Sequence, residues 1–260
     1  MKACSERITT IAFNGEQCQV IDWHQCDKHG PYPHTIISPR SGILGFAGGC
    51  PACRDERRQH KLFGALCIPP RFKDKTFRNY KVTPESREVF DYLASYAMNI
   101  HESIKAGRSV ILTGTPGTGK THLACALLKH AVANGHTALF TSAAKIFRTI
   151  RETWDTHESE REAIDRFVNV DLLCIDEVGV QAGSDNERNL MFQVINERYE
   201  AMRPTILISN ETMAGVRKVL GPRVIDRLKE NGGKSFAMAW KSYRDQEASA
   251  KCCSNPTDWV

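Results

Sequence analysis

The sequence lacks any long hydrophobic run, and no segment approaches the roughly 18 apolar residues that a membrane-spanning helix needs. Its first residues, Met1 to Arg7, also lack the apolar segment of a signal peptide. We therefore expect a protein that does not enter a membrane and is not exported. In a reducing cytoplasm its ten cysteines are expected to be thiols or metal ligands rather than disulfides.

Most of the chain carries no net charge. Residues 81–260 contain 23 Lys/Arg and 23 Asp/Glu, so their charges cancel, whereas residues 1–80 contain 12 Lys/Arg and 7 Asp/Glu, a difference of +5. Six of the ten cysteines also lie in residues 1–80. This change in composition predicts a domain boundary near residues 65–80.

A phosphate-binding pattern is present at residues 114–121, which read G-T-P-G-T-G-K-T and match the P-loop pattern G-x-x-x-x-G-K-T. Its glycines let several backbone N–H groups face one phosphate, while Lys120 reaches the β and γ phosphates and Thr121 is a ligand of Mg²⁺. The apolar run 109–113 before it is typical of a buried strand, and residues 121–133 after it have helical spacing. An N-K-x-D run, which a guanine-specific GTPase would carry, is absent. The predicted nucleotide-binding residues are Gly114, Thr115, Pro116, Gly117, Thr118, Gly119, Lys120 and Thr121.

A second apolar run, residues 170–175, ends in the carboxylates Asp176 and Glu177, which is the Walker B pattern. Asp176 is expected to hold Mg²⁺, and Glu177 to orient and deprotonate the water that attacks the γ-phosphate. The alternative is a strand that merely ends with two polar residues in solvent. The P-loop upstream favours the catalytic interpretation, and the pair predicts hydrolysis of ATP.

Two later features stay open when the residues are considered alone. Asn210 follows the apolar run 205–209 and could sense the γ-phosphate, or could equally act as a turn former or helix cap. Arg223 and Arg227 lie four residues apart on one face of a helical segment. They could complete the ATP site of a neighbouring subunit, but surface ion pairs around Asp226 are the simpler interpretation.

Strands and helices alternate from about residue 84 onward, with a helical pattern over 84–105 and a further strand expected at 137–141. Such alternation predicts an α/β domain with a parallel sheet and helices on both faces.

The N-terminal third contains a zinc-binding pattern. Cys26-x2-His29 and Cys50-x2-Cys53 are two tight pairs, twenty residues apart, and together they predict a closed, structural Zn²⁺ site with the ligands Cys26, His29, Cys50 and Cys53. The stretch between the pairs is expected to form a short β-hairpin, as in zinc ribbons. Cys18 and His24 are left out of the site because neither lies in such a pair. The basic segment 54–61 that follows is either a helix that meets phosphates or an acidic partner, or a solvated helix face.

The order of these motifs resembles the DnaC family, the AAA+ helicase loaders of bacteria, their phages and prophages. The resemblance covers about residues 68–245 and includes Trp240-Lys241-Ser242-Tyr243-Arg244. It implies that Asn210 is the sensor 1 residue, Arg227 the arginine finger with Arg223 close by, and Arg244 the sensor 2 arginine. It also implies that residues 143–167 are a helical insertion facing single-stranded DNA, with Arg148 and Arg151 as candidate contacts.

The resemblance implies an ATPase with ATP and Mg²⁺ that self-associates when ATP binds, hydrolyses it slowly, and loads a DnaB-type replicative helicase onto single-stranded DNA at replication initiation. An alternative is an IstB-like ATPase that remodels target DNA for transposition, which shares every motif after residue 68. The zinc module departs from the best-known loaders and is similar to phage and prophage relatives, so it could bind the helicase, DNA or another replication protein. We expect a zinc domain at 1–65, a linker at 66–83, an AAA+ ATPase domain at 84–246 and a tail at 247–260.

Overall fold

The computed structural model describes most of the chain, and the described residues belong to two compact units, Met1–Lys61 and Leu62–Val260. No helix within the described part of the chain is long and apolar enough to cross a membrane. The expected basic segment 54–61, Arg244 and the tail lie outside the described residues. The described ranges are 10–13, 15–45, 50–53, 66–155, 159–179 and 185–243.

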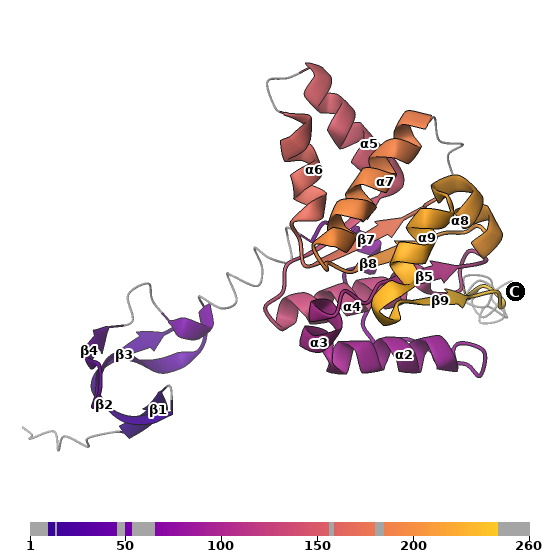
Figure 1. The fold of residues 1–260 in the computed structure, drawn as a ribbon. Helices are drawn as coiled ribbons and strands as arrows, with labels where there is room; N and C mark the ends of the chain where they lie inside the picture. The colour runs from indigo at the N-terminus through magenta and orange to yellow at the C-terminus, as the bar shows by residue number, and fades with distance from the viewer. Residues whose placement is uncertain are drawn as a thin grey trace, which may run out of the picture. The chain divides into compact units, whose positions relative to one another are not determined.

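The small unit contains a four-stranded antiparallel sheet in which each strand pairs with the next along the chain (Figure 1). The expected hairpin between the two ligand pairs is formed by β3 and β4, and β2 extends it on the other side. Cys18 and Ile36 are fully buried in this unit, which has few other buried apolar side chains among its described residues. The strands are β1 (Thr10–Phe13), β2 (Glu16–Cys26), β3 (Gly30–Ser38) and β4 (Gly42–Gly45).

The large unit is built on a five-stranded parallel sheet with the order β6-β7-β8-β5-β9. β5 leads into the P-loop, β7 ends at Asp176, and β8 lies between them, so the carboxyl ends of all three strands meet at one edge. The expected parallel sheet is therefore confirmed. The strands are β5 (Val110–Thr113), β6 (Ala138–Ser142), β7 (Leu172–Asp176), β8 (Thr205–Ile208) and β9 (Lys234–Ala237).

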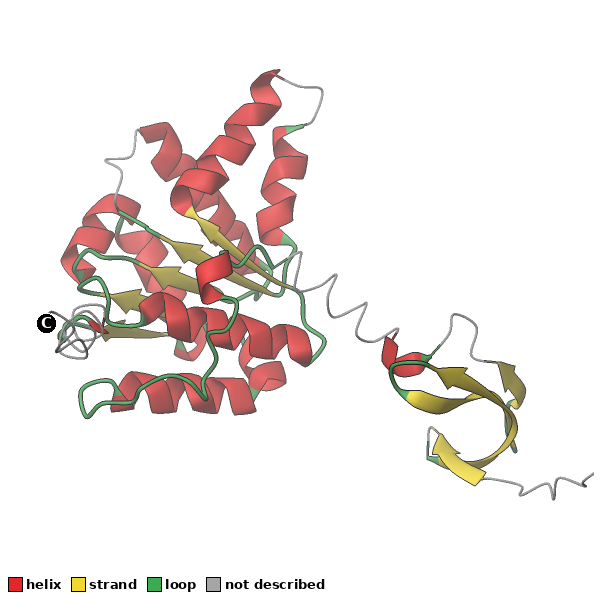
Figure 2. Cartoon of the chain, turned by 180° about the vertical axis from the view of Figure 1, so that it is seen from behind, coloured by secondary structure: helices red, strands yellow, loops and turns green. Residues whose placement is uncertain are grey.

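Helices cover both faces of this sheet (Figure 2). The strands carry apolar side chains on both faces, so both faces have to be shielded from water. Within β5, Val110 and Leu112 face one apolar core, and Ile111 faces the other. The first core includes α2 (Arg87–Met98), α3 (Ile100–Lys105) and α4 (Lys120–Ala133). The second includes α5 (Ala143–Glu152), α6 (Glu160–Val168), α7 (Asp185–Glu200), α8 (Met213–Leu220) and α9 (Pro222–Lys229).

One predicted helix is divided in the structure, and a second break separates two neighbouring short helices. The helical pattern over 84–105 forms two helices, α2 and α3, because the backbone leaves the helical region at Asn99, where φ is −110° and ψ is 40°. Arg223 and Arg227 lie together on α9 as expected, and Gly221, with a φ of 84°, separates this helix from α8. Both breaks are local changes of backbone direction within an otherwise continuous apolar pattern.

The segment 66–83, which we expected to be a linker, is instead part of the large unit. Leu66 is fully buried, and its carbonyl oxygen accepts a hydrogen bond of 2.8 Å from the backbone N–H of Phe140 on β6. Tyr80 is buried in the same apolar core as α2 and α4. The apolar residues of this segment therefore pack on the core of the large unit, which explains why composition alone placed the boundary too far along the chain.

A fully buried cation, Arg198 of α7, connects the end of α6 to the sheet. The α5–α6 pair, which corresponds to the helical insertion expected at 143–167, stands beyond the sheet in Figure 1, with η2 (Thr153–Asp155) after α5. Arg198 Nη1 donates to the carbonyl oxygens of Phe167 and Val168 at the C-terminus of α6, at 2.9 and 3.0 Å. These carbonyls carry the negative end of the helix dipole and so stabilise the positive charge. Further contacts reach Val170, Asp171, Pro204 and Thr205.

Replacing Arg198 by methionine is expected to lower the free energy of unfolding by about 3 kcal/mol or more, because several buried carbonyl groups lose their donors at once. Burial lowers the pKa of Arg198 to about 9, so the side chain is still charged at neutral pH and its loss removes a charged donor. Chemical denaturation of the Arg198→Met variant and the wild type measures the difference in the free energy of unfolding. Arg87→Met, at an exposed position of α2, is the matched control and should unfold like the wild type. Equal stability of the Arg198→Met variant and the wild type would contradict this role.

Candidate nucleotide-binding site and metal centre

The P-loop connects β5 to the N-terminus of α4. Two of its glycines lie so close to other parts of the chain that a side chain would not fit. Gly114 has a φ of 121°, and a Cβ atom there would lie 2.3 Å from the carbonyl oxygen of Met238. Gly119 has a φ of 94°, and a Cβ atom there would lie 2.7 Å from the ring of Tyr80. Other residues would be strained at either position and would also clash. The loop can therefore keep this path only with glycine.

Lys120 and Thr121 start α4 and lie at the centre of the site. The Lys120 side chain is buried, and Nζ donates to the carbonyl oxygens of Gly114 and Thr115, each at 2.7 Å. The Thr121 hydroxyl donates to Asp176 Oδ2 at 2.9 Å. The two residues predicted to hold Mg²⁺ are thus in contact, and their oxygen atoms are the ligands that this ion prefers. Burial raises the pKa of Asp176, and a bound cation would favour its ionised form.

Glu177 follows Asp176 and adopts a backbone conformation that side chains rarely occupy, with a φ of 59°. Its N–H donates to Asp176 Oδ1 at 2.7 Å. The carboxylate is exposed and lines the same cleft as Lys120 and Thr121. A left-handed non-glycine residue costs about 1 kcal/mol or more, and such strain is concentrated at functional sites. The strain here aims a carboxylate into the cleft.

Asn210 lies at the tip of β8, between the P-loop and Asp176, as the strand order requires, and its side chain is exposed on the cleft. Two backbone contacts fix this tip on the P-loop side. The N–H of Ser209 donates to the carbonyl of Leu112 at 2.9 Å, and the N–H of Gly114 donates to the carbonyl of Glu211 at 3.3 Å. The Ser209 hydroxyl donates to the carbonyl of Val178, on the Walker B side. The tip is therefore fixed between both phosphate-site loops.

The cleft around these residues contains about 1400 Å³ of unfilled space, including its opening to solvent. Two tyrosines that our sequence reasoning did not assign to the site help to form it. The Tyr80 hydroxyl donates to the carbonyl of Thr118 at 3.4 Å, and the Tyr243 N–H donates to the carbonyl of Gly117 at 3.0 Å. Aromatic walls beside a phosphate loop suit a nucleotide base. Further cleft residues are Arg71, Phe72, Lys75, Asn79, Lys81 and His122.

The two arginines of α9 lie outside this cleft. Arg227 places its guanidinium over the rings of Phe192 and Tyr199, at 5.1 and 5.5 Å from the ring centroids. Its Nη1 atom is buried and has no hydrogen-bond partner among the described residues. Arg223 is exposed, one helical turn earlier. The structure thus separates the pair into a packed arginine and an exposed one.

The two candidate DNA contacts on the insertion also differ. Arg151 forms an ion pair with Glu187 of α7 at 2.6 Å, which gives it a structural role in fixing α5. Arg148 is exposed on the same helix. Of the two, Arg148 is the side chain that the structure leaves most accessible to a ligand.

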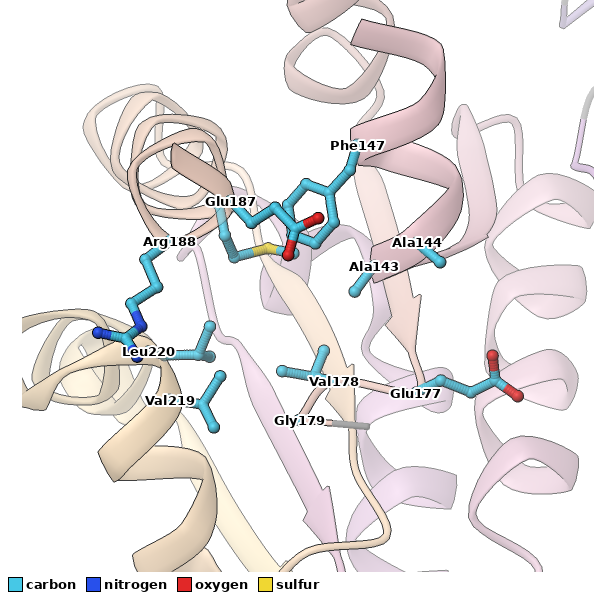
Figure 3. Close-up of a pocket in the computed structure, with 11 residues that line it drawn as sticks. Ala143, Ala144, Phe147, Glu177, Val178, Gly179, Glu187, Arg188, Val219 and Leu220 are labelled. Carbon is cyan, nitrogen blue, oxygen red and sulfur yellow. The ribbon is translucent and has the colours of Figure 1, made fainter. Parts of the chain in front are cut away.

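A second pocket borders Glu177 on the side away from the nucleotide cleft. It is lined largely by apolar side chains from α5, α7 and α8, including Phe147, Val178 and Leu220 (Figure 3). Figure 3 also shows the Glu177 carboxylate turned away from this pocket. The P-loop and the Thr121–Asp176 pair line the nucleotide cleft and not this pocket.

The predicted zinc ligands come together in the small unit. Cys26 and His29 flank the turn between β2 and β3, and Cys50 and Cys53 approach the same point. Cys26 Sγ lies 3.6 Å from Cys53 Sγ, and His29 Nδ1 lies 3.7, 3.8 and 3.3 Å from the sulfur atoms of Cys26, Cys50 and Cys53. Tetrahedral bonds to Zn²⁺ of the usual lengths place such atoms about 3.6–3.8 Å apart. The four residues therefore fit a zinc ion.

The cluster shifts the pKa values of Cys26 and Cys53 in opposite directions. Backbone N–H groups of Lys28 and His29 lower the pKa of Cys26 to about 6, and thiolate is the form that binds metals. The hydrogen bond to Cys26 raises the pKa of Cys53, because a second thiolate beside the first is unfavourable without a cation. Cys18, which we left out of the site, is buried elsewhere, with Sγ 3.9 Å from the carbonyl oxygen of Glu16.

Replacing both Cys50 and Cys53 by serine is expected to remove one equivalent of zinc from the purified full-length chain, and to abolish the folded state of the small unit. The reason is that so small a core needs the metal for its stability. Elemental analysis measures the metal, and NMR of the β2–β3 amides measures the fold. Cys67→Ser, at an exposed cysteine outside the cluster, should retain the zinc. A double variant with full zinc content would rule out this site.

Comparison with known proteins identifies the family. The sequence pattern of IstB-like ATP binding proteins matches residues 51–250. The replicative helicase loader DnaC of Escherichia coli strain K12 is 32% identical over 190 residues, which are 73% of this chain and 77% of DnaC. The uncharacterized protein YdaV of the same strain is 29% identical over 188 residues, 72% of this chain and 75% of YdaV.

Solved structures show the same fold. A crystal structure of the DnaC helicase loader matches with a TM-score of 0.58 at 23% identity, covering 66% of this chain and 100% of the other. AMPPCP-bound DnaA from Aquifex aeolicus matches with a TM-score of 0.58 at 22% identity, covering 72% of this chain and 56% of DnaA. The large unit thus has the fold of these proteins, an α/β core built on a parallel sheet. Together with the sequence matches, this shows that the chain belongs to the family of IstB-like ATP binding proteins and is a relative of the DnaC helicase loaders.

Proposed function

We propose that this protein is an ATP-dependent loader that places a DnaB-type replicative helicase on single-stranded DNA when replication starts. The observation that carries the proposal is the contact between Thr121 and Asp176, with Lys120 and Glu177 in the same cleft, in a chain that is 32% identical to a replicative helicase loader. These four residues are the minimum set for binding and cleaving a nucleoside triphosphate. In a loader, the nucleotide acts as a switch that orders an assembly.

The chain's own residues have distinct tasks in this scheme. Lys120 would exchange the carbonyl oxygens of Gly114 and Thr115 for the β and γ phosphates of ATP. Thr121 and Asp176 would hold Mg²⁺, which supplies positive charge that neutralises the phosphates. Glu177 would accept a proton from the attacking water, and Asn210, fixed between the two loops, would orient that water or the γ-phosphate.

Self-association would bring Arg227 or Arg223 of one subunit to the phosphates of the next. The exposed Arg223 can reach a neighbour as it stands, whereas Arg227 has to leave the rings of Phe192 and Tyr199. Arg244, outside the described residues, is the proposed sensor 2 arginine. In the sequence it directly follows Tyr243, whose N–H donates to the carbonyl of Gly117 in the P-loop.

Arg227→Ala is expected to bind ATP like the wild type but to lose the rise in hydrolysis rate that accompanies assembly, because the neighbour's phosphates lack their added positive charge. Steady-state hydrolysis measured over a range of protein concentrations tests this. Arg217→Ala, at an exposed arginine of α8, is the control. A concentration dependence equal to that of the wild type would refute Arg227 as the finger, and Arg223→Ala is then the variant to compare.

Two further surfaces would serve the loading reaction. Arg148, exposed on the insertion, is the proposed contact for single-stranded DNA. The small unit, with its Cys26-His29-Cys50-Cys53 cluster, would recognise the helicase or another replication protein. Its sequence lies almost entirely outside the family match, which begins at residue 51, so this module would set the partner while the ATPase core supplies the switch.

Co-purification with a DnaB-type helicase, with and without ATP, tests the proposal. We expect a complex that forms with ATP and dissociates after hydrolysis. The IstB-like alternative predicts binding and bending of duplex DNA with no affinity for the helicase. That second outcome would replace the loader proposal with a role in transposition.

A further inference from the structure

The small unit carries a second group of metal-binding side chains, separate from the cysteine cluster. Asp22 and His24 lie on β2 and His34 lies on β3, and one potential ligand atom from each lies within 4.8 Å of the other two. None of the three lines the nucleotide cleft. We propose that Asp22, His24 and His34 bind a divalent transition-metal ion of the zinc type. This proposal does not depend on the ATPase or on helicase loading.

Irregular pairing of β2 with β3 brings the three residues together. Asp22 lies opposite Thr35, but the next residue, Trp23, lies opposite Pro33, so His34 is an extra residue on β3 at this point. Such a bulge bends a strand and redirects one side chain. Here the His34 ring stacks on the His24 ring, with the centroids 3.9 Å apart and the planes 11° apart. The bulge therefore places two imidazoles beside one carboxylate.

The spacing of the ligand atoms already suits one ion. His24 Nε2 lies 3.2 Å and His34 Nδ1 lies 3.6 Å from the same oxygen, Asp22 Oδ2. Bonds of 2.0–2.2 Å at tetrahedral angles place nitrogen and oxygen ligands about 3.4 Å apart. Because the rings are nearly parallel, one ring has to rotate so that both nitrogen lone pairs meet the ion. The exposure of the side chains, 49% for His24 and 33% for His34, allows this rotation.

The chemistry of the three side chains selects the metal. Two imidazoles and a carboxylate suit Zn²⁺ and its neighbours in the transition series, whereas Mg²⁺ and Ca²⁺ prefer oxygen ligands alone. Three protein ligands leave a coordination position open to solvent, unlike the closed set of three cysteines and a histidine. The Asp22–His24–His34 site has no thiolates and its side chains are exposed. An ion at this site should therefore exchange readily with solvent, while the ion at the cysteine cluster stays bound.

A Zn²⁺ titration of the full-length chain against a chromophoric chelator tests the proposal, starting from protein whose cysteine site is filled. We expect the wild type to take up one further equivalent. His24→Ala and His34→Ala are each expected to lose that equivalent and to keep the first. His101→Asn, at an exposed histidine of α3 in the large unit, is the control and should titrate like the wild type.

Absence of a second equivalent in the wild type, or its retention by both histidine variants, would overturn the proposal. If a histidine variant also loses the first ion, Asp22→Asn decides, because it exchanges a carboxylate oxygen for an amide nitrogen at the same size. A weakened second site in Asp22→Asn supports the proposal, and an unchanged one overturns it.

Discussion

Lys120→Ala is expected to weaken ATP binding by about 3 kcal/mol, roughly a hundredfold, because removal of one partner of a buried charged contact has a cost of this size. The loss should be specific to the phosphates. Binding of a fluorescent ATP analogue, followed by titration, measures it, and adenosine binding should change little.

The matched control for this variant is Lys129→Ala on the same helix. Lys129 Nζ donates to the carbonyl oxygens of Phe72 and Lys73, not to the P-loop, so its loss should leave the affinity for ATP within a few-fold of the wild type. Equal ATP affinities for Lys120→Ala and the wild type would show that the cleft does not bind the triphosphate as proposed.

Glu177→Gln is expected to keep ATP binding and to slow hydrolysis by roughly 10²–10⁴-fold, the usual contribution of a general base. Glutamine keeps the size and polarity of the side chain but does not accept the proton of the attacking water. Single-turnover hydrolysis with excess protein measures the chemical step apart from product release. We also expect the variant to hold any ATP-dependent complex for longer.

Glu211→Gln, at the tip of β8, is the control for this experiment. Glu211 is exposed and its side chain lies beside Gly179, two residues after Glu177, but it does not line the nucleotide cleft. Its hydrolysis rate should match that of the wild type. Equal rates for Glu177→Gln and the wild type would refute the assignment of the base.

The parts of the site that could be predicted are those encoded by short stretches of chain. The P-loop glycines, Lys120 and Thr121 are contiguous, and the run before Asp176 identifies its own strand. The parallel order of the strands then brings Thr121 and Asp176 into contact. The pair spacing of Cys26 with His29, and of Cys50 with Cys53, likewise gives the cluster without knowledge of the fold.

The parts that could not be predicted depend on contacts between distant segments. Tyr80 and Tyr243 meet the P-loop only because the segment before α2 and the segment after β9 pack on it. Arg198 lies in a helix whose other buried side chains are apolar, and no residue next to it in the sequence indicates that it is fully buried among carbonyl groups. A bulge in the pairing of β2 with β3 brings His34 to Asp22 and His24. The alternation of polar and apolar side chains in the sequence does not predict such a shift in strand register.

The two tyrosines beside the P-loop have a thermodynamic consequence. The Tyr243 hydroxyl donates to the carbonyl of Lys81 at 2.6 Å, so the chain before the ATPase core, the chain after it and the phosphate loop form one bonded group. Any ligand that shifts residues 66–81 must change the affinity of the loop for nucleotide. By reciprocity, the nucleotide must change the affinity for that ligand by the same factor. A partner that displaces residues 66–81 would therefore be coupled to ATP binding through the contacts of Tyr80 and Tyr243.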